Sequence, residues 1–433
     1  MKKTTTTFVF LISVIVLCPR LSLSAQPDSP ATILHAKLEA TRDVNQAQQL
    51  AIATTKNMSY PQLFDFWEEG CKKTWADVKT AARAELAQRW KEKPEMQVAV
   101  EFVKDKKNNS SFRLELIDAI GYHKRKITHN ERADIYNSFK QILTENSNPS
   151  EVRNAACHRL GGLIRLMDEK GELSENDYLS FTTALCNLLL NENEPPELRS
   201  EAAVCLGVVK YHQAEQQLLQ VLDRWHQLDL QITRGTMLGL GHLKSKKAVS
   251  KISEVLNETT DMPVYATAAV SLGMIGGAEV IEPLIKNRSR FPIPCCRSAL
   301  TQSKSSIQAV VEGRDKTCAL ETAIEAYCLT ADEQEWQSIF ESLITLNVTA
   351  NITLNVTAKK KVLQMAAELS PNLDGVKHII TQIKESPENK ELYECADILL
   401  ARMKQPIAQI DAQTGNTQID IIPPAPNNQK GDK

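Results

Sequence analysis

The chain has 433 residues, of which 51 are basic and 53 acidic, so that its net charge is close to neutral. A protein that holds nucleic acid by electrostatics needs a basic field, and this balance argues against that class of function. Aromatic residues make up 5% of the chain and charged residues 24%. This profile is typical of a long helical array and argues against an all-β domain.

The N-terminus predicts a secretory signal peptide over residues 1–25. Lys2 and Lys3 precede an apolar run at 8–17, and small residues follow at 22–25. The apolar run is too short for a stable membrane-spanning helix. We expect cleavage after Ala25, with Ser24 as the second choice. The chain is therefore expected to be exported, to the periplasm first and as a secreted protein second.

Residues 26–105 are predicted to form helices that cap the N-terminal end of an array. Their helical segments, such as YPQLFDFWEEGCKK, lack the signature of a small residue or leucine followed by glycine that marks the segments after them. A stack of repeats needs such a cover. The region concentrates aromatic residues, which either line a ligand pocket or peptide groove or, the favoured interpretation, fill the core of the cap: Phe64, Phe66, Trp67, Trp75 and Trp90.

Residues 106–403 contain a repeated unit. Five similar segments, among them SEVRNAACHRLG and MPVYATAAVSLG, end in glycine at intervals of 40, 46, 34 and 32 residues. The glycines are Gly121, Gly161, Gly207, Gly241 and Gly273. Most segments are followed by a second amphipathic run, so each unit is predicted to be a helix, a glycine turn and a second helix. Such units bury their apolar faces by stacking, which predicts an all-α fold of the α-solenoid type.

The segments PVYATAAVSLGMIGGAEVIEPLIK and PPELRSEAAVCLGVVKYHQAEQQLLQVL resemble HEAT repeats of the short, phycobilisome-lyase-like type. The resemblance is specific over residues 108–292 and weaker as far as 403. It implies that an arginine early in each first helix locks adjacent repeats. The matching residues are Arg113, Arg153, Arg199 and Arg234, and Tyr265 departs from the pattern, so the ladder is expected to be interrupted there.

No catalytic, cofactor-binding or metal-binding residue is predicted, and no cofactor is expected. The sequence contains no HExxH, CxxC or phosphate-loop motif. It also lacks the His-Glu pairs that supply metal ligands in the HEAT-type deoxyhypusine hydroxylases. His123, His212 and His242 recur just after a repeat glycine. They are interpreted as polar turn residues and not as a row of ligands, because no carboxylate recurs beside them.

Two further features allow two interpretations each. The basic run 123–126 is either a site for phosphate or an acidic partner or, as favoured, a solvated turn. Removal of the signal peptide leaves nine cysteines, most of them within apolar helical runs, where they are expected to be buried free thiols. Cys295 and Cys296 are the exception, since either could pair elsewhere in an exported protein.

Residues 344–359 read ITLNVTANITLNVTAK, an octapeptide written almost twice. The alternation is that of a strand, but a lone strand in a helical array has no partner. We interpret the duplication as a tandem insertion at a connection between helices. Residues 404–433 lose all periodicity and are predicted to be a disordered tail.

These observations favour an exported interaction scaffold that binds a protein or peptide on the concave surface of the solenoid. The alternative is an enzyme or a cofactor-attachment factor, which rests on the occurrence of similar repeats in bilin lyases. Fold-level analogy of that kind transfers function poorly. The sequence indicates neither the identity of the partner nor the oligomeric state.

Overall fold

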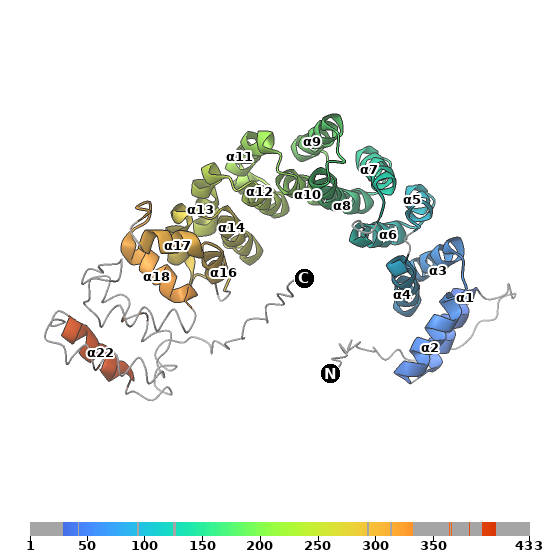
Figure 1. Cartoon of the computed structure of the whole chain (residues 1–433), viewed down its shortest axis with the longest axis horizontal. Coiled ribbons are helices and arrows are strands. Elements are labelled where there is room, and N and C mark those ends of the chain that lie inside the picture. The colour runs from blue at the N-terminus through green and yellow to red at the C-terminus, as the bar shows by residue number, and fades with distance from the viewer. Residues whose placement is uncertain are drawn as a thin grey trace. The chain divides into compact units, whose positions relative to one another are not determined.

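A computed structural model describes residues 29–41, 43–92, 95–123, 127–291, 294–311, 314–331 and 392–403, together with residues 363, 365 and 381. Over these residues the regular structure is helical throughout, which confirms the predicted all-α class (Figure 1). The predicted signal peptide, the duplicated octapeptide, the tail at 404–433 and residues 124–126 of the basic run lie outside the described residues. The chain divides into two compact units, residues 1–127 and 128–433.

The described part of the first unit contains six helices: α1 (Pro30–Ala40), α2 (Val44–Thr55), α3 (Tyr60–Lys72), α4 (Ala76–Glu92), α5 (Met96–Lys104) and α6 (Ser110–His123). Phe64, Phe66, Trp67 and Trp90 are buried, which confirms the core-filling interpretation for these four residues. Trp75 is only half-buried, and its ring stacks on His35 with centroids 4.4 Å apart. The aromatic cluster is therefore mainly structural.

The second unit alternates first and second helices of successive repeats. The first helices α8 (Ser150–Glu169), α10 (Pro196–Val208), α12 (Leu230–His242), α14 (Met262–Ile275) and α16 (Cys295–Gln302) pack side by side in one row. The second helices form another row: α7 (His129–Thr144), α9 (Glu175–Leu190), α11 (Glu215–Asp223), α13 (Val249–Glu258) and α15 (Ile281–Asn287). Figure 1 shows the two rows as separate layers of this unit. The unit also contains α17 (Lys304–Val311), α18 (Leu320–Thr330) and α22 (Tyr393–Met403).

The prediction that the repeat glycines form turns is wrong. Gly121, Gly161, Gly207, Gly241 and Gly273 all lie inside first helices. Gly161, Gly207, Gly241 and Gly273 instead allow neighbouring first helices to approach closely. A Cβ on Gly207 would lie 2.3 Å from the carbonyl oxygen of Gly239 in α12, and one on Gly273 would lie 2.8 Å from the Cα of Ala299 in α16. Because the first helices touch backbone to backbone, we assign their row to the concave side of this unit.

Three of the four repeat arginines share one arrangement. Arg113, Arg153 and Arg199 are buried, and the Nε of each donates to a carbonyl ten residues earlier. The acceptors are Val103, Leu143 and Leu189, at 2.7, 2.9 and 3.0 Å. Each arginine therefore joins the start of its own helix to the end of the preceding helix.

The expectation that Arg234 occupies the same position is wrong. Arg234 is exposed, and its Nε donates to the hydroxyl of Thr267 at 3.2 Å. It stands seven residues before its glycine, whereas the other three arginines stand eight before theirs, so buried Thr233 fills the equivalent position. In the next repeat Tyr265 fills that position and donates its hydroxyl to the Asn287 carbonyl. The arginine ladder therefore ends at Arg199, one repeat earlier than expected.

Candidate interaction surface

One face of α10, α12 and α14 is covered by neither row of helices. From the first residue of each helix, every fourth residue along this face is incompletely buried. We call this set the free stripe: Pro196, Ser200, Val204 and Val208 in α10; Leu230, Arg234, Leu238 and His242 in α12; and Met262, Ala266, Val270 and Met274 in α14. The first residues of the last two helices are well exposed, Leu230 at 45% and Met262 at 47%.

The free stripe is unusually apolar where it crosses α14. Every residue of α14 that is not buried is apolar, and the helix contains no charged residue. An amphipathic surface helix would carry polar side chains on that face. The equivalent positions of α8 follow this rule, since they hold Ser150, Asn154 and His158. The exposed face of α14 is therefore apolar like a surface that another protein covers, although neither row of helices covers it.

The free stripe holds no acidic residue and two residues that can carry positive charge, Arg234 and His242. Burial and the charge of Arg165 lower the pKa of His242. Two exposed lysines, Lys210 and Lys244, lie two residues after the ends of α10 and α12.

Both lysines adopt a left-handed backbone, with φ of 57° and 55°, where the next repeat uses Gly276 at φ 67°. This conformation costs a residue with a side chain about 1 kcal/mol or more. The negative end of the helix dipole favours a cation there. Lys210 and Lys244 thus place two cations along the C-terminal edge of the free stripe.

The carboxylates near the free stripe are mostly engaged elsewhere. The Glu201 Oε1 lies 2.8 Å from the Nδ1 of His158, within hydrogen-bonding distance. Asp229 and Asp261 cap α12 and α14 by accepting from backbone amides at 2.7 and 2.8 Å. Glu197, at the opposite, N-terminal edge, is exposed. The electrostatic character of the surface is therefore positive at its C-terminal edge.

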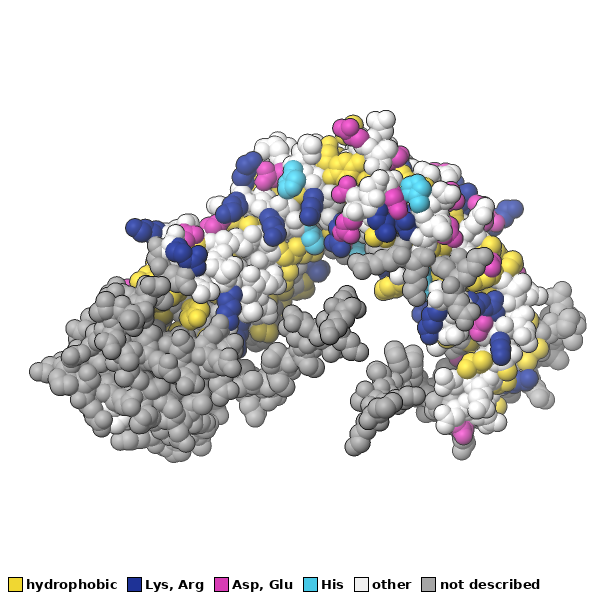
Figure 2. All heavy atoms as spheres, in the orientation of Figure 1, with side chains coloured by type: hydrophobic (Ala, Val, Ile, Leu, Met, Phe, Trp, Pro, Cys, Tyr) yellow, Lys and Arg dark blue, Asp and Glu magenta, His cyan; other side chains and the backbone are white. Residues whose placement is uncertain are grey.

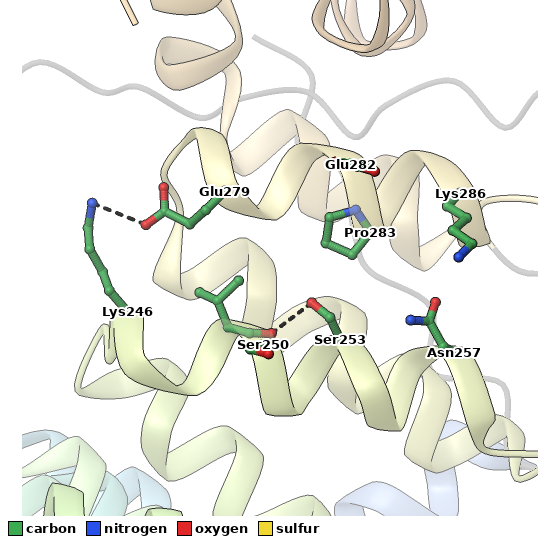
Figure 3. Close-up of a pocket in the computed structure, with 9 residues that line it drawn as sticks. Lys246, Ser250, Ser253, Asn257, Glu279, Glu282, Pro283 and Lys286 are labelled. Carbon is green, nitrogen blue, oxygen red and sulfur yellow. Dashed lines mark hydrogen bonds and ion pairs between the residues drawn. The ribbon is translucent and has the colours of Figure 1, made fainter. Parts of the chain in front are cut away.

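A groove of about 470 Å³ lies on the other row, between α13 and α15 (Figure 3). Its charges are of both signs, and at one end Lys246 pairs with Glu279 at 3.1 Å. Its polar groups do not converge on one point, so the groove supports no particular chemistry. Its lining consists of Lys246, Val249, Ser250, Ser253, Asn257, Glu279, Glu282, Pro283 and Lys286.

His226, Glu254 and Glu258 bring metal-ligand atoms within 4.8 Å of one another. The ammonium group of Lys251 already pairs with one carboxylate of this cluster, because its Nζ donates to both carboxylate oxygens of Glu254 at 2.9 and 3.0 Å. The indole of Trp225 donates to the same carboxylate at 3.3 Å. The arrangement is therefore a solvated ion network between repeats.

The three histidines that follow repeat glycines are placed differently from one another. His123 ends α6 and contacts the ring of Trp90 edge-on, whereas His212 lies in the short 3-10 helix His212–Ala214 and is exposed. His242 is the last residue of α12 and belongs to the free stripe.

The described cysteines are free thiols, and six of the eight are buried, which confirms that interpretation for them. Cys157 and Cys205 face each other across α8 and α10, with their Sγ atoms 3.7 Å apart. Cys295 is half-buried at the start of α16, and a hydrogen bond from Cys296 lowers its pKa to about 7. The Tyr265 hydroxyl lies 3.2 Å from the Cys296 Sγ.

A sequence model of the PBS lyase HEAT-like repeat matches residues 264–288, which span most of α14 and all of α15. No curated protein matches the chain. Among solved structures, an engineered protein is similar at 15% identity and a TM-score of 0.35, covering 88% of this chain and 100% of its own. Human deoxyhypusine hydroxylase in complex with glycerol is similar at 12% identity and a TM-score of 0.27, and the match covers 72% of this chain and 96% of that chain. Kap95p, in a structure with RanGDP, is similar at 13% identity and a TM-score of 0.39, and the match covers 86% of this chain and 56% of that chain.

The alternating helices and the repeat match define an α-solenoid. Over residues 264–288, in α14 and α15, the chain is similar to a PBS lyase HEAT-like repeat. The sequence held a signal for the free stripe that our sequence reasoning missed: MPVYATAAVSLGMI offers apolar residues to every side of one helix. No helix within the described ranges is long and apolar enough to cross a membrane.

Proposed function

We propose that this protein is an exported interaction scaffold that binds a protein or peptide partner through the row of first helices in its second unit. The single observation that carries the proposal is the uncharged helix α14, whose apolar residues reach the surface on the face that neither row of helices covers. Burial of such apolar area is the main favourable term in most protein association. Stacked repeats also supply an extended surface on which a partner can lie.

The charge distribution fits a protein partner better than nucleic acid. Figure 2 shows basic and acidic side chains interspersed over the described part of the visible face. A nucleic-acid site would need a continuous basic patch to contact successive phosphates. The free stripe instead combines apolar residues with a few cations.

The scaffold role is tested by affinity capture with the mature chain, residues 26–433, from the native envelope and secretome. We expect a specific protein to be retained by the wild type and released by a stripe variant such as Val270→Asp. Leu179→Asp is the matched control, because Leu179 is an exposed apolar residue of α9 in the other row. A purified protein that turns over a substrate or carries a bound cofactor would overturn the proposal in favour of an enzyme.

Export is tested separately by N-terminal sequencing of the protein from fractionated cells. The signal-like residues 1–25 predict a mature chain that begins at Gln26 and is found outside the cytoplasm. An intact Met1 in the cytoplasmic fraction would refute export and would leave the interaction role standing.

A further inference from the structure

The apolar and charged residues of the free stripe together specify the chemistry of a partner. We propose that the stripe binds an amphipathic, acidic helical segment of another protein, which crosses α10, α12 and α14 with its apolar face down. The proposal rests on the scaffold function above and adds to it a location, a class of partner and an orientation.

The apolar contact is continuous across the three helices. Val204, Leu238 and Val270 occupy the same position of successive helices, and Val208 and Met274 flank them one turn further on. Neighbouring helices lie about 8–10 Å apart, so a segment that crosses all three spans roughly 20–25 Å. A helix of about 15 residues has that length, at 1.5 Å per residue. Methionine on such a surface adapts to differently shaped apolar side chains.

Charge complementarity selects an acidic segment over a basic one. Lys210 and Lys244 line the C-terminal edge of the stripe, and Arg234 lies on the stripe itself. The stripe holds no carboxylate, and Glu201, beside it, is already engaged by His158. A partner helix with carboxylates on the flank above Lys210 and Lys244 would therefore gain two ion pairs. A lysine-rich helix would meet uncompensated like charges.

The orientation follows from the two edges. Glu197 lies at the N-terminal edge of α10, opposite Lys210 at the C-terminal edge of the same helix. An acidic flank is therefore favoured on one side of the partner helix only. Reversal of the flank would place its carboxylates near Glu197 and away from both lysines.

The test uses synthetic fluorescein-labelled peptides and the full mature chain, residues 26–433. The acidic probe is a helix of about 15 residues with leucines on one face and glutamates elsewhere. Two control probes replace its glutamates with lysines or its leucines with serines. Fluorescence anisotropy should show the acidic probe binding at least about tenfold more tightly than either control, with an affinity that weakens as salt rises.

Two variants and their matched controls locate the binding. Leu238→Glu should weaken the acidic probe about tenfold or more, whereas Leu190→Glu, at an exposed leucine of α9, should leave it unchanged. The double variant Lys210→Gln/Lys244→Gln should weaken binding and flatten its salt dependence. Lys286→Gln, an exposed lysine of α15, should change neither. Circular dichroism and thermal unfolding matching the wild type show that each variant is folded.

Several results would overturn the inference. They are failure of the acidic probe to bind, equal binding of the basic probe, or unchanged binding to Leu238→Glu. A dimer in solution that Leu238→Glu dissociates would assign the stripe to a second copy of the chain. Probe binding that appears only after deletion of residues 404–433 would assign it to the chain's own tail. If a captured partner survives Leu238→Glu but is released by Val270→Asp, this inference falls and the scaffold function stands.

Discussion

The guanidinium of Arg153 donates to both carboxylate oxygens of Glu194, at 2.7 and 2.8 Å, while its Nε donates to the Leu143 carbonyl at 2.9 Å. Arg153 is 5% exposed and Glu194 is 9% exposed. One side chain thus ties together the end of α7, the start of α8 and the turn that precedes α10. The planar fork of arginine matches the two oxygens of a carboxylate, which a lysine cannot do.

Replacement of Arg153 by methionine should therefore destabilise the second unit by roughly 3–5 kcal/mol, because Glu194 is left buried and unpaired. Urea unfolding followed by circular dichroism measures the loss. The double variant Arg153→Met/Glu194→Leu should recover much of the loss, since replacing both partners removes the buried charge.

Arg165→Met is the matched control. Its exposed pair with Glu169, at 3.3 Å, should contribute less than about 1 kcal/mol. If Arg153→Met were as mild as this control, the buried pair would have no special weight in the stack.

Gly207→Ala reverses the usual sign of a glycine substitution in a helix. Alanine normally stabilises a helix interior by about 1 kcal/mol relative to glycine. Here the added Cβ would lie 2.3 Å from the Gly239 carbonyl oxygen, so the two helices must separate. We expect a destabilisation of roughly 1–3 kcal/mol in thermal or urea unfolding. Gly241→Ala should destabilise less, because the nearest atom to its added Cβ is the Ser271 Cα at 3.2 Å. Equal effects at the two positions would contradict this account.

These glycines also show what the sequence could and could not predict. Their spacing located the first helices and the repeat correctly, because small residues recur wherever two helices touch. Their conformation was mispredicted, since a glycine chosen for close approach and one chosen for a left-handed turn look alike in sequence. The left-handed residues after α10 and α12 are lysines, Lys210 and Lys244, which no glycine pattern could reveal.

The sequence misplaced the end of the arginine ladder and missed the free stripe for different reasons. Arg234 was misassigned by one residue, and a shift of one residue turns a helical side chain by about 100°, out of the core. The free stripe was missed because periodicity identifies apolar faces without saying which of them a neighbour covers. In α14 the apolar residues occur on every side, so sequence alone does not separate the covered face from the uncovered one. The structure separates them, because Val264 and Tyr265 are buried and Val270 is only partly buried.

Cys295 should be the most reactive of the described thiols. It is half-buried, and a hydrogen bond from Cys296 lowers its pKa to about 7. Burial raises the pKa of Cys71 to about 12, and that of Cys318 to about 11. Since the thiolate is the nucleophile, alkylation of Cys295 by iodoacetamide should rise through pH 7, about two units below an ordinary thiol.

Peptide mass mapping after brief labelling at pH 7.5 identifies the modified residue. Cys296→Ser keeps a hydrogen-bond donor and should preserve most of this reactivity, whereas Cys296→Ala should move the inflection upward. Labelling of Cys71 before Cys295 would contradict the assignment.

Glu115 in α6 should make the first unit sensitive to acid. Its carboxylate accepts from the Trp67 indole at 2.8 Å and from Lys79 at 3.1 Å, and it pairs with Arg83 at 2.6 Å. Burial raises its pKa, but the hydrogen bonds from Trp67, Arg83 and Lys79 outweigh burial, so the pKa lies below the ordinary value of 4.5. A depressed carboxylate pKa stabilises the fold above the unfolded-state pKa, and this contribution is lost as the pH falls through the folded-state pKa.

Glu115→Gln should therefore cost roughly 1.5–3 kcal/mol at pH 7, the range for hydrogen bonds to a charged group. The difference from the wild type should shrink progressively below pH 4.5. Denaturant unfolding at a series of pH values, followed by tryptophan fluorescence because Trp67 contacts the carboxylate, measures both quantities. Glu101→Gln is the control, since Glu101 is 64% exposed and pairs with Lys104 one turn away. A Glu115→Gln penalty that stayed constant down to pH 3 would show that the ionised carboxylate is not what holds α3, α4 and α6 together.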